Sequence, residues 1–177
     1  GDKRRQFVAR AAANDWDTVV MTQGAFQRIR VSPDSMADYL SSQLEIHRAR
    51  LDTARDSGRD MTIKRLEKAV MRTDERLQAL ADLPRDPGIS WEQTGVDYVI
   101  VDEAHLYKNL VTITNIQDAA IEGSKRAEDL HMKLELLRRT HGDRVATLAT
   151  ATPIANSIAE AHVMQRYLRP DLLRDAG

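Results

Sequence analysis

The stretch VIVDEAH at residues 99–105 joins an apolar run to two adjacent acids. Its β-branched residues favour a short buried strand. Burying an unpaired carboxylate is costly, so we expect the strand to end before Asp102 and the acids to lie just beyond it. In parallel α/β sheets, ligands bind at this carboxyl edge. The stretch therefore predicts both a strand and a candidate site at the end of it.

Two other segments have the same character. Residues 18–21 (TVVM) and 145–150 (VATLAT) are rich in β-branched residues and end in polar turns, as does the strand predicted at 96–101. Helical patterns lie between and after them. This alternation predicts an α/β fold with a parallel sheet and right-handed crossovers.

Residues 32–83 contain no strand signal. A Ser-Pro-Asp start at residue 32, apolar residues with 3-4 spacing and a Gly-containing turn at residue 58 predict an antiparallel, coiled-coil-like helical hairpin. Residues 34–83 contain nine basic and ten acidic side chains. This balance favours a structural or protein-docking arm. Contact with nucleic acid is the alternative.

The composition excludes several classes of protein. The 177 residues carry a net charge of −1, so the chain has no globally basic coat for nucleic acid. Cysteine is absent, which excludes disulfides and thiol chemistry. No apolar run is long enough for a membrane span, and we expect a cytoplasmic protein without a membrane partner. No second histidine or cysteine lies at ligand spacing from His105, so a zinc site is not expected.

The adjacent acids suggest nucleotide chemistry. A magnesium–nucleotide complex supplies the positive charge that the pair requires. Asp102 can hold the metal, directly or through water, while Glu103 deprotonates an attacking water. The plain alternative is a strand-to-loop turn with solvated acids.

Two further groups of residues are candidates for the same site. Thr150 and Thr152 lie in a loop of small hydroxyl residues that follows the strand predicted at 145–150, although a simple strand–turn–helix corner has the same composition. Lys125 and Arg126 begin a predicted helix beside Ser124. Cations at a helix start oppose its dipole, and a bound phosphate would resolve the conflict. Otherwise both side chains point into water.

These motifs resemble those of a known family. DEAH at 102–105, with Lys108 and Asn109 behind it, is similar to motif II of superfamily II DEAH-box helicases, especially the Swi/Snf-like branch. TATPIANS at 150–157 resembles motif III of that branch, and the segments at 17–23 and 167–173 resemble neighbouring motifs. The hairpin is an insertion relative to the compact family core. Its length and position are similar to those in large helicase-like proteins of bacterial mobile elements and phages.

The resemblance implies a RecA-like P-loop NTPase lobe that uses ATP and magnesium to move on, or remodel, double-stranded DNA. Residues 1–31 and 84–177 would form part of that lobe. By carry-over, Asp102 would coordinate magnesium, Glu103 would activate water and His105 would relay between the nucleotide and motif III. Thr150 and Thr152 would couple hydrolysis to DNA. The remaining DNA-binding or coupling candidates are Thr22, Gln23, Lys108, Asn109, Lys125 and Arg126.

The sequence also departs from the family pattern. It contains no Gly-x-x-x-x-Gly-Lys-Ser/Thr phosphate loop, and Ala151 replaces the usual glycine of motif III. The second lobe with its arginine finger is not in this chain, so we expect negligible hydrolysis by the chain alone. We also expect an exposed strand edge at 145–150 that favours dimerisation. The alternative function is a non-catalytic module, with a degenerate ATPase remnant that presents the hairpin to a protein partner.

Overall fold

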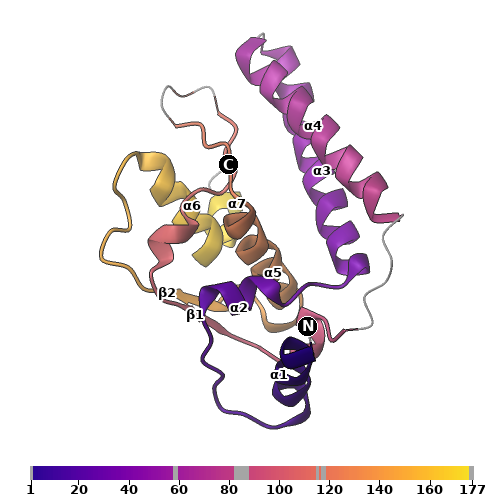
Figure 1. The fold of residues 1–177 in the computed structure, drawn as a ribbon. Helices are drawn as coiled ribbons and strands as arrows, with labels where there is room; N and C mark the ends of the chain where they lie inside the picture. Colours follow the sequence, from indigo (N-terminus) through magenta and orange to yellow (C-terminus); the bar gives the residue numbers. More distant parts are fainter. Residues whose placement is uncertain (1, 58–59, 82–87, 115, 117–118, 176–177) are drawn as a thin grey trace.

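A computed structural model describes residues 2–57, 60–81, 88–114, 116 and 119–175 (Figure 1). The elements are, in chain order, α1 (Asp2–Ala13), α2 (Gln23–Arg28), α3 (Pro33–Asp56), α4 (Asp60–Ala81), the 3-10 turn η1 (Trp91–Thr94), β1 (Val99–Val101), the 3-10 turn η2 (Ala104–Tyr107), α5 (Lys125–His141), β2 (Ala146–Leu148), α6 (Ile158–Leu168) and α7 (Pro170–Asp175). No helix among these residues is both long and apolar enough to cross a bilayer.

The parallel pair of strands matches the predicted α/β class at a coarse level. β1 and β2 pair in register, with Val99 opposite Ala146 and Val101 opposite Leu148. Both strands are shorter than the predicted segments. The described residues contain a two-stranded sheet, so the structure is a helix-rich α/β arrangement.

The prediction of fully buried strands was wrong for β1. Val99 and Val101 are buried, but Ile100 on the opposite face is 74% exposed. The reason is that no described element covers this second face. The inward residues instead join the main core, to which α5 contributes more buried residues than any other element.

The strand predicted at residues 18–21 was also wrong. These residues lie in an extended segment between α1 and α2, and no described strand pairs with them. Val20 is 90% exposed. β-branched residues favour extended backbone, but a strand also needs a neighbour for its ladder hydrogen bonds. Here that neighbour is missing from the described part of the chain.

Helix α5 is the centre of the core. Ala127, Leu130 and Leu134 are fully buried, and burial extends around most of the helix. A helix that is buried on most sides must satisfy its polar groups internally. Lys133 does so by donating from Nζ to the Phe26 carbonyl oxygen at 2.7 Å and to Asp129 Oδ2 at 2.8 Å. Its ammonium also lies 4.0 Å from the centre of the Phe26 ring, so this lysine holds α2 against α5.

Helices α3 and α4 pack side by side along their length, as the seam of apolar residues predicts (Figure 1). The side chain of Ser32 caps α3 by accepting the Ser35 N–H at 3.1 Å, and Pro33 occupies the first turn. Leu51 and Leu66 belong to a small apolar cluster between the helices that also includes Ile113.

The base of the hairpin is fixed to the rest of the chain by a buried polar contact. The Tyr39 hydroxyl on α3 lies 2.9 Å from His131 Nδ1 on α5. Tyr167 on α6 lies on another side of the same imidazole, with a distance of 6.2 Å between ring centres. The hairpin therefore shares the main core at its base, and its division from residues 1–31 and 84–177 stays a prediction.

The burial of the His131 side chain predicts a specific dependence of stability on pH. Burial lowers the pKa of His131 from about 6.5 to about 3, and Arg166 and Arg138 add to the effect. Between these values the unfolded chain binds a proton that the folded chain does not. Stability is therefore fully present above pH 6.5 and falls below it, by up to ~1.4 kcal/mol per pH unit from this residue.

Urea denaturation of the wild-type chain and of His131→Gln between pH 4.5 and 7.5 measures this effect. We expect a smaller loss of unfolding free energy on acidification for His131→Gln, because its side chain does not titrate. His47 and His162 remain in both proteins and serve as the internal control. Equal slopes in the two proteins would contradict the assignment to His131.

Candidate functional site

The acidic pair lies where the sequence places it, immediately beyond β1. Asp102 and Glu103 are both exposed. The Asp102 Oδ1 atom accepts the N–H of Glu103 at 2.9 Å, and Oδ2 accepts no hydrogen bond from the described residues. Glu103 Oε2 lies 3.1 Å from His105 Nδ1. The two carboxylates and the imidazole therefore form one solvent-accessible group at the carboxyl edge of the sheet.

The backbone at Glu103 adopts an unusual conformation. Its φ of 52° and ψ of 44° place it in the left-handed region, and it is the sole non-glycine residue with positive φ among the described residues. This conformation costs a residue with a side chain on the order of 1 kcal/mol. It lets the chain leave β1 and begin η2 at once, which turns the two acids outward at the strand end.

The segment at 17–23, which resembles another motif of the same family, contacts this edge. Gln23 Nε2 donates to the Asp102 carbonyl oxygen at 3.0 Å, across 79 positions of sequence. Thr22, the other predicted residue, is exposed and caps α2 by accepting the N–H of Ala25 at 3.2 Å. Gln23 thus joins the acidic edge directly, while Thr22 shapes the helix that carries it.

The loop after β2 lies at the same edge. The N–H of Ala104 donates to the Ala149 carbonyl oxygen at 2.9 Å, and the N–H of Ala149 donates to the Val101 oxygen at 2.8 Å. Beyond this point Thr150 Oγ1 accepts the N–H of Thr152 at 3.2 Å. The parallel pairing therefore brings the two predicted motifs into backbone contact.

Lys108, one of the predicted DNA-binding or coupling residues, lies inside the protein. It is buried, and its Nζ lies 3.2 Å from Glu160 Oε2 on α6. Asn109 is exposed, and its carbonyl oxygen accepts the Ser124 N–H at 2.7 Å.

Glu160 was missed as a site residue by sequence reasoning. Its spacing from Ser157 predicts a capping box at the start of α6, and this prediction was wrong. The Ser157 side chain forms no cap bond, and the Glu160 carboxylate instead accepts the N–H groups of Ala155 at 2.6 Å and Asn156 at 3.2 Å. Burial alone raises the pKa of Glu160, but these N–H donors and Lys108 outweigh it and hold that pKa below its ordinary value.

Lys125 and Arg126 begin α5 as predicted, and Ser124 caps the helix by accepting the Ala127 N–H at 3.2 Å. Lys125 is exposed and Arg126 is half-buried. Within the described residues neither forms a hydrogen bond or ion pair with Asp102 or Glu103. Both residues remain candidates for binding an anion at a place other than the acidic edge.

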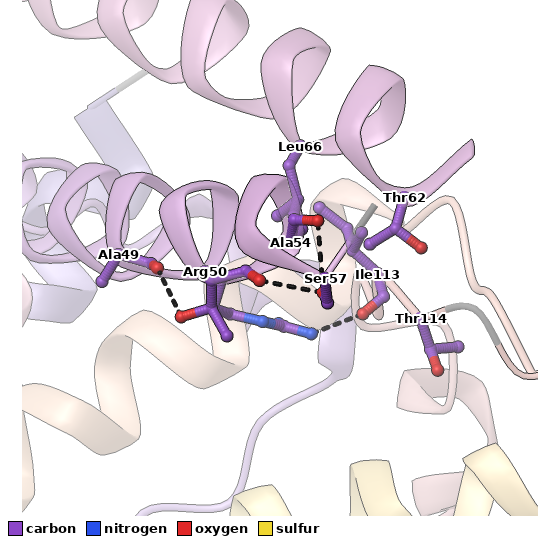
Figure 2. A pocket seen from close by; sticks show the side chains of 9 residues that line it. Ala49, Arg50, Ala54, Ser57, Thr62, Leu66, Ile113 and Thr114 are labelled. Carbon is purple, nitrogen blue, oxygen red and sulfur yellow. Dashed lines mark hydrogen bonds between the residues drawn. The ribbon is translucent and has the colours of Figure 1, made fainter. Parts of the chain in front are cut away.

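A hollow of about 300 Å³ lies on the hairpin, between α3, α4 and residues 113–114. Figure 2 shows the side chains that line it. The Arg50 guanidinium donates to the Ile113 carbonyl oxygen at 2.5 Å, and the Ser57 hydroxyl donates to the Ala54 carbonyl oxygen at 3.2 Å. Both donors are thus already hydrogen-bonded within the chain, whereas the buried Thr62 hydroxyl has no partner. The contact serves to fasten the hairpin to the segment after η2.

The acidic edge fits one half of a magnesium–nucleotide site. Magnesium prefers one or two carboxylates, with water and phosphate oxygens completing its shell. Asp102 and Glu103 meet that need, and no larger cluster of metal-binding side chains exists in the described part of the chain. The chain contains no phosphate loop. Its acidic residues therefore suit a metal ion and an attacking water, but the chain lacks the loop that would bind the phosphates of the nucleotide.

Residues 1–177 match a family model described as "Probable helicase domain". A relative, the protein called Defense against restriction protein B of Escherichia phage P1, is 25% identical over 166 residues. The match covers 89% of the chain but 7% of that relative, so the chain spans a small part of its length. No solved structure matches the chain.

The left-handed backbone at Glu103 predicts that this residue lowers the stability of the folded chain, although its carboxylate belongs to the candidate site. Replacing Glu103 by glycine relieves the left-handed conformation, and we expect the unfolding free energy to rise by about 0.5–1 kcal/mol. The matched control is Glu45→Gly on the exposed face of α3, where glycine costs about 1 kcal/mol. Urea denaturation of both variants measures the difference. A clear loss of stability in Glu103→Gly would show that the conformation is not strained.

Proposed function

Because the chain belongs to the family described as "Probable helicase domain", we propose that it forms part of the ATP-binding lobe of an ATP-dependent DNA helicase or translocase. The Swi/Snf-like DEAH branch is the finer part of this proposal. The observation that carries it is the exposed Asp102–Glu103 pair. Gln23 donates to the Asp102 carbonyl oxygen, and Ala149, just before the loop at 150–157, is hydrogen-bonded to the residues on either side of the pair. The acidic pair, Gln23 and this loop belong to three of the four segments whose sequences resemble helicase motifs.

In this proposal the two acids divide the work. Magnesium, when bound, neutralises charge on the phosphates of ATP. Asp102 holds the metal through its free Oδ2 or through a water. Glu103 accepts a proton from the attacking water. His105, with its Nδ1 atom 3.1 Å from Glu103 Oε2, orients that carboxylate.

The rest of the motor lies outside these residues. The phosphate cradle and an arginine finger have to come from other parts of the protein that carries the chain, because this sequence contains no phosphate loop. Double-stranded DNA is the proposed partner, with Gln23, Thr22 and the loop at 150–157 nearest to it. The phage origin of the relative supports a phage-encoded or bacterial protein that acts in the cytoplasm.

A non-catalytic interaction module is the second candidate. The missing phosphate loop favours it, as do the exposed apolar side chains of Ile46 and Met71 on the hairpin. Exposed apolar side chains on a mixed-charge arm suit a protein partner. In that case the acidic pair has no chemical task, and its replacement leaves every activity of the protein intact.

DNA-stimulated ATP hydrolysis by the full-length protein separates the two candidates. We expect Glu103→Gln to lower the hydrolysis rate by about 10²- to 10⁴-fold, because a positioned general base is lost. Binding of a fluorescent ATP analogue should persist, since the amide has the same shape.

The matched control is Glu45→Gln, which changes an exposed glutamate on α3 and should leave the rate at the wild-type value. If the full-length protein is inactive with every DNA tested, or if Glu103→Gln keeps the wild-type rate, the motor proposal fails. The interaction module then takes its place.

A further inference from the structure

We propose that Glu160 is a positioning residue which, together with Lys108, holds the loop at 150–157 in a fixed place against the acidic edge. This inference rests on the proposed function and names a coupling element within it. Neither residue touches the reacting atoms. Their effect passes through the two segments that they join.

The Glu160 carboxylate is saturated by contacts to two separate parts of the chain. Oε2 accepts the N–H groups of Ala155 and Asn156, and Oε1 accepts Asn156 Nδ2 at 3.1 Å. Lys108 Nζ completes the set at 3.2 Å from Oε2. The Lys108 and Glu160 side chains are 8% and 7% exposed. The two charged side chains are thus largely shielded from water, although Ala155 and Asn156 are exposed residues.

These contacts close a ring of chain around the edge of the sheet. At one end of the loop, Ala149 accepts the Ala104 N–H, directly after the acidic pair. At the other end, Glu160 binds Ala155 and Asn156 to Lys108, which follows η2. The loop is thus tied at both ends to the short 3-10 turn that Glu103 begins. A displacement of this turn has to move the loop as well.

The contacts that close this ring depend on the charges of the two side chains rather than on their shapes. A buried ion pair contributes little net stability compared with apolar packing, but removing one partner leaves an uncompensated charge. A glutamine at position 160 cannot accept all four donors, because one of its two heteroatoms is an NH₂ group. The pair is therefore suited to specifying one loop position, which is a positioning role.

The test uses the full-length protein with three variants: Lys108→Met, Glu160→Gln and the double variant. We measure the ratio of DNA-stimulated to DNA-free ATP hydrolysis, and the melting temperature Tm. Each single variant should lower the ratio about tenfold, within the usual range of coupling between sites. The double variant removes both buried charges, so its Tm should recover relative to the singles while the ratio stays low.

A purely structural role predicts the opposite pattern for the double variant. There the ratio recovers together with Tm, and that result would overturn the proposal. The matched control is Glu92→Gln, which removes another carboxylate that accepts a backbone N–H, that of Ser32 at the start of α3. This control should lower Tm without changing the ratio. An equal loss of ratio in the control would also overturn the proposal.

Hydrogen exchange keeps this inference distinguishable from the motor proposal. In the full-length protein, Lys108→Met should raise the exchange rate of the Ala155 and Asn156 amides about tenfold, with α5 unchanged. If the wild-type protein hydrolyses no ATP, the proposed function fails, yet this exchange result still supports the positioning contact. Unchanged exchange at both amides would overturn the contact itself, whatever the ATPase result.

Discussion

The parallel pairing of β1 with β2 is the constraint on which the candidate site depends. Parallel strands need a crossover, and here η2, the following segment and the buried helix α5 supply it. Because both strands run the same way, their carboxyl ends meet. DEAH and the loop at 150–157, more than forty residues apart in sequence, therefore share one edge, with the Ala104–Ala149 hydrogen bond between them.

Buried polar groups fix the elements around this pair. Lys133 ties α2 to α5, and α2 in turn brings Gln23 to Asp102. The Lys108–Glu160 pair ties α6 to the turn after the acids. Such groups are expensive to desolvate and add little net stability, but they disfavour any alternative packing that leaves a charge unpaired. The strained backbone at Glu103 fits the same picture, since strain collects where a site is held in place.

Local patterns in the sequence predicted the secondary-structure elements well. They predicted the contacts between residues distant in sequence only in part. The helix starts at Ser32 and Ser124 and the acids beyond β1 are local features, so they could be predicted. The segment at 18–21 could not, because strand formation depends on a neighbour that residue types do not reveal. Glu160 looked like a capping residue, since its spacing from Ser157 is the same in both roles. The burial of Lys108 could not be predicted, because a lysine next to a motif carries no sign of a buried partner.

The most direct test is a structure of the full-length protein with magnesium and a non-hydrolysable ATP analogue. The account predicts the metal beside Asp102, either bound to the carboxylate or one water away, and Glu103 facing the terminal phosphate. A nucleotide bound elsewhere, with both carboxylates still in solvent, would contradict the central claim that this sheet edge is the catalytic edge of a motor.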